Sequence, residues 1–133
     1  MCAQFASKLG HGMEASAALA ELVELSTQVV EAIIVASGGS TEPAGTVQAA
    51  HAAGDERARA LAAAGADLLE AAAGIRAAGG RIERVHVDLK RGSLVVCSDG
   101  ERSIVATTIA EPTAGLVAYD LRAALRRLRE EAA

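Results

Sequence analysis

The sequence predicts a single α+β domain in which helices and short strands alternate. Three segments carry apolar residues at helical spacing, and five short runs are rich in β-branched residues and bounded by Gly- or Pro-containing turns. With 133 residues, 51% of them hydrophobic, the chain has enough material for one core and too little for two. The predicted order of elements is α-β-β-α-β-β-β-α.

The first predicted helix covers Glu14–Ser26 and follows an aperiodic stretch, residues 1–13, that we expect to be a flexible tail. Its larger apolar residues recur on one side: Leu19, Leu22, Val23 and Leu25. The β-branched run QVVEAIIVAS and the segment TEPAGTVQ then indicate a hairpin. Because Pro43 has no N–H to donate to a ladder, the second strand is expected at a sheet edge or with a bulge.

A long Ala-rich helix is predicted to begin with Asp55 as its N-cap and to end at Gly79 and Gly80. Large and small residues alternate along one stripe of it: Leu61, Gly65, Leu68, Ala72 and Ile75. Since the large residues recur every seven positions and the small ones permit close approach, this stripe is expected to pack against another helix. The alternative is that its Ala and Gly reflect the codon usage of a GC-rich genome.

Three further runs, RIERVHVDL, SLVVCSD and RSIVATTI, predict an antiparallel meander. The dipeptide Asp99-Gly100 between the last two is typical of a type I′ hairpin turn. This arrangement leaves RIERVHVDL at the edge of the sheet with one unpaired side.

Thr113 is then predicted to cap a final helix that runs to the end of the sequence. Its apolar residues share one face: Val117, Leu121, Ala124, Leu125 and Leu128. Four arginines lie away from that face: Arg122, Arg126, Arg127 and Arg129. They form either a solvated face paired with Glu130 and Glu131, which we favour, or a contact for an acidic partner.

Composition argues against several classes of partner. The formal net charge is −4, which argues against a basic surface for nucleic acid, and Trp is absent, which removes a platform for base stacking. We therefore expect no nucleic-acid partner. The longest apolar run, VVEAIIVAS, is far shorter than the roughly 20 residues of a membrane helix. Two cysteines and an N-terminus without an apolar leader indicate a cytoplasmic protein.

One constellation invites a catalytic interpretation, namely Cys97 with His86 and Asp88 on the preceding strand. If Arg91-Gly92 is a two-residue turn, His86 faces Cys97, whereas a three-residue bulged turn separates them. Neither register supplies an oxyanion hole or a helix N-terminus aimed at the sulfur. We therefore expect Cys97 to be a buried core residue and the chain not to be an enzyme; a thiol enzyme is the alternative.

Metal and phosphate chemistry are not expected either. His11, His51 and His86 stand apart, without a second ligand at the spacing of a zinc or iron site. The segment GGSTEPAG lacks the Lys and the glycine spacing of a phosphate-binding loop. We expect no catalytic, cofactor-binding or metal-binding residues.

The segments LVVCSDGERSIVATTI and AGLVAYDLRAAL, together with the long Ala-rich helix, resemble roadblock-type domains, the family of the dynein light chain roadblock. The resemblance covers residues 14–133. It implies a five-stranded antiparallel sheet ordered 2-1-5-4-3, with the central helix on one face and the terminal helices on the other. The sequence departs from the family at VASGGSTEPAGTVQ, where members often have Asp-Gly followed by a firm strand.

The free side of RIERVHVDL predicts a homodimer, because pairing with its own copy satisfies the edge N–H and C=O groups and brings two central helices together. Roadblock-type proteins are similar in this respect. The expected contact residues are Leu61, Gly65, Leu68, Ala72, Ile75, Val85 and Val87. The resemblance, which is to the bacterial GTPase-partner branch of the family, further implies a non-enzymatic regulatory module that binds a Ras-like small GTPase; modulation of the nucleotide cycle is a weaker expectation than binding. The alternative is a scaffold or ligand-sensing module unrelated to a GTPase.

Overall fold

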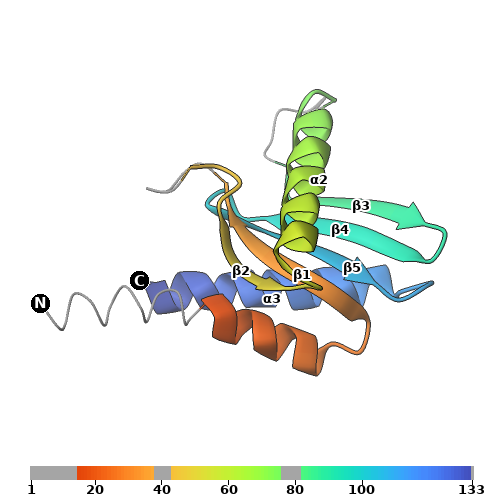
Figure 1. The fold of residues 1–133 in the computed structure, drawn as a ribbon, viewed down its shortest axis with the longest axis horizontal. Helices are drawn as coiled ribbons and strands as arrows, with labels where there is room; N and C mark the ends of the chain where they lie inside the picture. The colour runs from red at the N-terminus through yellow and green to blue at the C-terminus, as the bar shows by residue number, and fades with distance from the viewer. Residues whose placement is uncertain (1–14, 38–42, 76–81, 133) are drawn as a thin grey trace, which may run out of the picture.

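In the computed structural model, which describes residues 15–37, 43–75 and 82–132, one antiparallel sheet is covered by helices on both faces (Figure 1). The strand order is β2-β1-β5-β4-β3. Helix α2 lies on one face, while the N-terminal helix (residues 15–25) and α3 lie on the other. The predicted fold class, element order and sheet order are confirmed. The predicted tail, residues 1–13, lies outside the described residues.

The elements follow the predicted order closely. Their bounds are β1 Val29–Ala36, β2 Val47–His51, α2 Asp55–Ala73, β3 Arg84–Leu89, β4 Gly92–Ser98, β5 Arg102–Thr108 and α3 Ala114–Ala132. In the N-terminal helix, Leu19 and Leu22 are buried as predicted. Leu25 was predicted on the same apolar stripe, but it is 72% exposed and lies outside the core. Leu25 is the last helical residue, and the chain turns toward β1 directly after it.

Strand β2 is short, lies at a sheet edge and pairs with a bulge, as its proline predicts. It pairs antiparallel with β1, and the register shifts between Ile34 and Val35. Pro43 lies before the strand, where its carbonyl oxygen accepts hydrogen bonds from the N–H (3.2 Å) and the hydroxyl (2.8 Å) of Thr46. Pro43 is therefore the first residue of the turn that leads into β2, and it leaves the ladder intact.

Both ends of α2 differ from the prediction. Gly54, with φ at 120°, occupies the N-cap position, so Asp55 is the first helical residue. Only glycine adopts such a φ without strain, and the carboxylates of Asp55 and Glu56 then face the positive end of the helix dipole. The helix ends at Ala73, with the N–H of Gly74 bonded back to the preceding turn. Gly79 and Gly80, the predicted end, lie outside the described residues.

The turn at Asp99-Gly100 is not of type I′. That type requires a positive φ at both central residues, but here only Gly100, at 96°, has one. Instead, Asp99 Oδ1 accepts the backbone N–H groups of Glu101 and Arg102, both at 2.8 Å, while the N–H of Asp99 donates to the carbonyl of Arg102. The aspartate side chain thus organises a three-residue connection between β4 and β5.

Two cores lie on opposite faces of the sheet. Under α2, the buried residues include Ile33, Leu61, Val96 and Val105. Gly65 lies directly over β5, because a Cβ atom built at Gly65 would lie 2.5 Å from Val105 Cγ2. The missing side chain therefore lets α2 approach its own sheet closely.

The other core lies between the sheet and the two terminal helices. The face of α3 predicted to be apolar is buried there: Val117, Leu121, Ala124, Leu125 and Leu128. Thr113 precedes this helix, and its carbonyl accepts the N–H groups of Leu116 and Val117. Its own N–H donates to Gln28 Oε1, which ties the start of α3 to the segment before β1.

A three-residue polar contact fastens α2 to the middle of the sheet. Arg57 donates to both carboxylate oxygens of Glu31 on β1 over 2.9–3.1 Å, and the hydroxyl of Thr107 on β5 donates to the same carboxylate (3.2 Å). The hydrogen bonds and charge of Arg57 lower the pKa of Glu31 below its ordinary value of 4.5. Such bidentate contacts to a mostly buried carboxylate are stronger than exposed ion pairs.

We expect Glu31→Gln to lower the free energy of unfolding at pH 7 by about 1 kcal/mol. Because the pKa of Glu31 is lower in the folded state, its stabilisation is present above about pH 4.5 and is lost as pH falls through the lowered value. The difference between wild type and variant, measured by urea unfolding, should therefore shrink toward pH 3. Glu24→Gln, which changes an exposed glutamate of the N-terminal helix, is the control. A difference that does not depend on pH would contradict the assignment.

Candidate functional site

The candidate site is the free edge of the sheet at β3 and the part of α2 beside it. Strand β3 pairs with β4 through six residues, from Arg84 opposite Cys97 to Leu89 opposite Gly92. The N–H of Ser98 donates to the carbonyl of Glu83, just before the strand. Because hydrogen-bonded pairs alternate in an antiparallel ladder, Arg84, His86 and Asp88 turn their N–H and C=O groups outward. The edge therefore carries backbone groups available for another strand.

Side chains of β3 point alternately to the two faces of the sheet. Val85 packs against the core under α2, and Val87 shares that face because it is two residues away. Both are half-buried. Arg84, His86 and Asp88 point to the opposite face, the one covered by α3.

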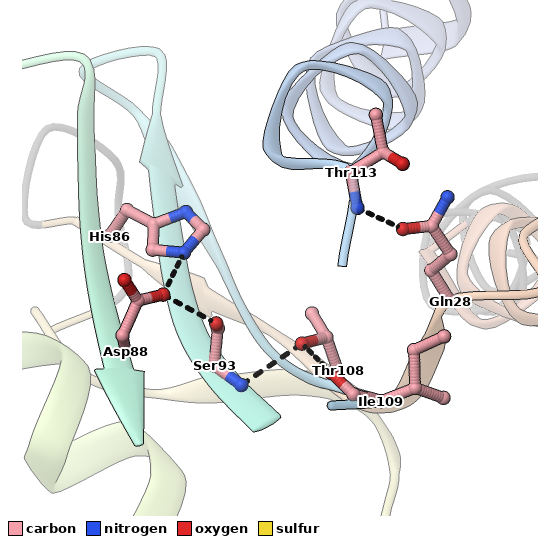
Figure 2. Close-up of polar contacts among 7 residues, drawn as sticks. All are labelled: Gln28, His86, Asp88, Ser93, Thr108, Ile109 and Thr113. Atoms are coloured by element: carbon pink, nitrogen blue, oxygen red, sulfur yellow. Dashed lines mark hydrogen bonds and ion pairs between the residues drawn. The ribbon is translucent and has the colours of Figure 1, made fainter. Parts of the chain in front are cut away.

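His86 and Asp88 belong to a hydrogen-bond network that crosses three strands (Figure 2). His86 Nε2 and the hydroxyl of Ser93 both donate to Asp88 Oδ1 at 3.0 Å. The N–H of Ser93 donates to Thr108 Oγ1, whose hydroxyl donates to the carbonyl of Ile109. The hydrogen bonds from Ser93 and His86 lower the pKa of Asp88.

This network is not a nucleophilic triad. A serine nucleophile needs a histidine that accepts its hydroxyl proton, but Ser93 donates to a carboxylate. Ser93 is also only 2% exposed. The network instead holds the outer strand against β4 and β5. Sequence reasoning missed Ser93 because it depends on the hairpin register, which places Asp88 opposite Ser93.

The register also removes the proposed pairing of His86 with Cys97. The two-residue connection consists of Lys90 and Arg91, so His86 lies opposite Val95, and Cys97 lies opposite Arg84. Gly92 decides this, since it has φ at 149° and a Cβ there would lie 2.3 Å from the carbonyl oxygen of Thr108. Only glycine fits so close to β5, which places Gly92 in the strand and not in the turn.

Cys97 is a core residue, as its apolar neighbours predict. Its side chain is fully buried among residues that face α3. Burial raises the pKa of the thiol, although Arg84 and Arg122 oppose that effect. A buried thiol with a raised pKa is a poor nucleophile.

The predicted dimer-contact residues fall into two groups. Leu61 and Gly65 are buried under α2, within the chain's own core. The others lie where a second molecule can reach them in part or fully: Leu68, Ala72, Ile75, Val85 and Val87. Of these, Ile75 is the most prominent, with 78% of its surface exposed just after the end of α2.

Within the described ranges, no group of three or more His, Cys, Asp or Glu residues is arranged to hold a metal ion. Among the helices in the part of the chain that the structure covers, none is both long and apolar enough to cross a membrane.

Solved structures identify the fold. A Roadblock/LC7 domain from Streptomyces avermitilis superimposes with a TM-score of 0.74 at 21% identity, covering 87% of this chain and 95% of that one. Myxococcus xanthus MglB gives 0.67 at 14% identity, covering 90% and 87%. A structure described as MglB with tetrameric arrangement gives 0.62 at 20% identity, covering 92% and 93%.

The chain therefore has the Roadblock/LC7 fold, over almost its whole length. Sequence comparison adds nothing to this assignment, because no protein-family model and no curated protein matches the chain. At identities of 14–21% the likeness defines the architecture.

We expect Cys97 to react with a thiol reagent at least about 100-fold more slowly in the folded protein than in urea, because reaction requires opening of the core. The rate is measured with a Cys2→Ser variant, in which Cys97 is the one remaining cysteine. Cys97→Ala is the blank. Rates within tenfold of each other would show an accessible thiol and would revive the thiol-enzyme alternative.

Proposed function

We propose that this chain is a cytoplasmic, homodimeric regulatory module that binds a Ras-like small GTPase and carries no catalytic residues of its own. The observation that supports this most strongly is the likeness of the fold to Myxococcus xanthus MglB across about nine-tenths of both chains, together with the resemblance of the sequence to roadblock-type proteins, which serve Ras-like GTPases. The free strand edge at β3 and the half-exposed apolar residues beside it supply a physical basis for the dimer.

Dimer formation through β3 would continue the sheet across a twofold axis. The outward backbone groups of Arg84, His86 and Asp88 would pair with those of the second copy. Leu68 and Val85, both only partly buried by their own chain, would gain cover from the second α2. Leu61 and Gly65 would not contact the second copy; they would support the dimer indirectly, because they hold α2 close to its own sheet.

The proposed GTPase platform is the outer side of the two α2 helices with the loops at the strand edges. This side of α2 is exposed, and its small residues, Ala60, Ala63, Ala66 and Ala71, lie among the charged residues Arg59, Asp67 and Glu70. Small side chains lose little conformational entropy on binding and allow a partner close to the helix. Arg57 is held by Glu31, so the proposal concerns binding and assigns no catalytic arginine.

The dimer predicts that Ile75→Glu weakens self-association by at least about tenfold, since a charge replaces an apolar side chain in the contact. Light scattering at decreasing concentration measures the mass. Leu25→Glu is matched to it, because Leu25 is 72% exposed but lies at the end of the N-terminal helix, away from β3. A wild-type protein that is monomeric at micromolar concentration would contradict the dimer.

The partnership predicts that immobilised protein retains a candidate Ras-like GTPase, with unequal retention of the GTP-like and GDP-bound states. Ala66→Arg, on the exposed side of α2, should reduce retention at least about tenfold through steric conflict. Ala17→Arg places the same side chain on the N-terminal helix and should have no effect. Loss of retention by both variants, or no retention of either nucleotide state by wild type, would count against this function.

A further inference from the structure

A groove of about 420 Å³ lies beside α3, on the face of the sheet opposite to α2. Helix α3 forms one wall with Tyr119, Arg122, Leu125, Arg126 and Arg129. The end of β4 and the residue before β3 form the other wall.

A second recess of about 470 Å³ shares Glu83 and Arg122 with this groove and extends it to Arg84 on β3. The two recesses adjoin at Glu83 and Arg122, and four arginines line them: Arg84, Arg122, Arg126 and Arg129. We refer to the two adjoining recesses as the arginine groove.

These four arginines have no acidic partner among the residues that the structure describes. Two other arginines are paired, Arg57 with Glu31 and Arg127 with Glu21. Arg122, Arg126 and Arg129 share one stripe of α3, at intervals of four and three residues, yet form no such pair in the described chain. The favoured sequence interpretation pairs this face with Glu130 and Glu131, whose side chains lie outside the described ones, so that interpretation stays a prediction.

Two acidic residues also line the groove, Glu83 and Asp99. Asp99 Oδ1 accepts two backbone N–H groups of the turn, and its Oδ2 atom is buried. The negative charge of Asp99 reduces the positive potential of the groove but does not cancel that of four arginines. Glu83 is exposed and is the acid that a bound group would meet. The groove thus presents more positive than negative charge, on a chain whose formal net charge is −4.

We propose that the arginine groove binds an acidic peptide segment of a partner protein in an extended conformation. Along α3, Arg122 and Arg126 are about 6 Å apart in rise. Alternate side chains of an extended peptide are about 6.6 Å apart. Acidic residues at alternate positions therefore match the arginine spacing. Leu125, buried at the floor, and Tyr119, 59% exposed, provide apolar contact for a residue between them.

A peptide fits this surface better than other anions. This protein carries a formal net charge of −4, so nucleic acid and anionic membranes repel it as a whole. A local basic depression on such a protein favours a short acidic ligand that does not contact the remaining, negatively charged surface. The surface is also recessed, which suits a chain rather than a flat bilayer. Because it lies on the face opposite to α2, this proposal does not depend on the GTPase partnership.

The test uses the full-length protein and a fluorescein-labelled peptide with three glutamates at alternate positions separated by leucines. A peptide with glutamines in their place is the ligand control. We expect saturable binding of the glutamate peptide in fluorescence anisotropy, weakened as salt is raised. Arg122→Gln combined with Arg126→Gln should weaken it by about fivefold or more, and Glu83→Gln should strengthen it by about twofold.

The matched control combines Arg59→Gln with Arg91→Gln, which removes two exposed arginines outside the groove. This variant should bind as the wild type does. Equal weakening by both double variants would show diffuse charge attraction and would overturn the proposal. Absence of binding to 1 mM peptide would overturn it as well. Binding to phosphatidylserine vesicles, lost in the groove variant while the peptide is not bound, would assign the groove to a membrane and also overturn it.

Discussion

The pairing of β5 with both β1 and β4 is the interaction on which the rest of the structure depends. It joins the first hairpin to the C-terminal meander, although β1 and β5 are far apart in sequence. Since β5 is then covered on both faces, Val105 faces α2 while Ile104 and Ala106 face the terminal helices. A strand with this double burial needs apolar residues at successive positions, and IVA in its centre supplies them.

The same topology creates two surfaces of different chemistry. In the meander, β5 lies at the centre of the sheet, β4 lies next to it and β3 is outermost. Strand β3 is therefore an edge strand, with free backbone groups and half-buried valines. On the opposite face, α3 does not cover the whole width of the sheet, and its arginine stripe lines the depression that remains. The first surface suits another strand and helix, and the second suits a flexible acidic chain.

Much of the fold follows from local patterns. The proline before β2 predicted a strand at a sheet edge or with a bulge, and the apolar face of α3 was predicted residue by residue. The errors lie where a single backbone angle decides. Gly54 replaces Asp55 as the N-cap, and Gly92 sets the β3–β4 register that separates His86 from Cys97. A pattern of residue types cannot distinguish these cases, because Gly54 is required by its positive φ alone and Gly92 by its positive φ together with the close carbonyl oxygen of Thr108.

By itself, the sequence determined the class, order and number of elements and the burial of Cys97, since these depend on periodicity and turn residues within short segments. Only the tertiary structure decided which small residues serve the chain's own core. Gly65 fits against Val105, a contact between residues far apart in sequence. It also decided how the arginines of α3 are placed, since Arg127 meets Glu21 on another helix while Arg126 lines the groove. Such pairings depend on distances in space that no local pattern contains.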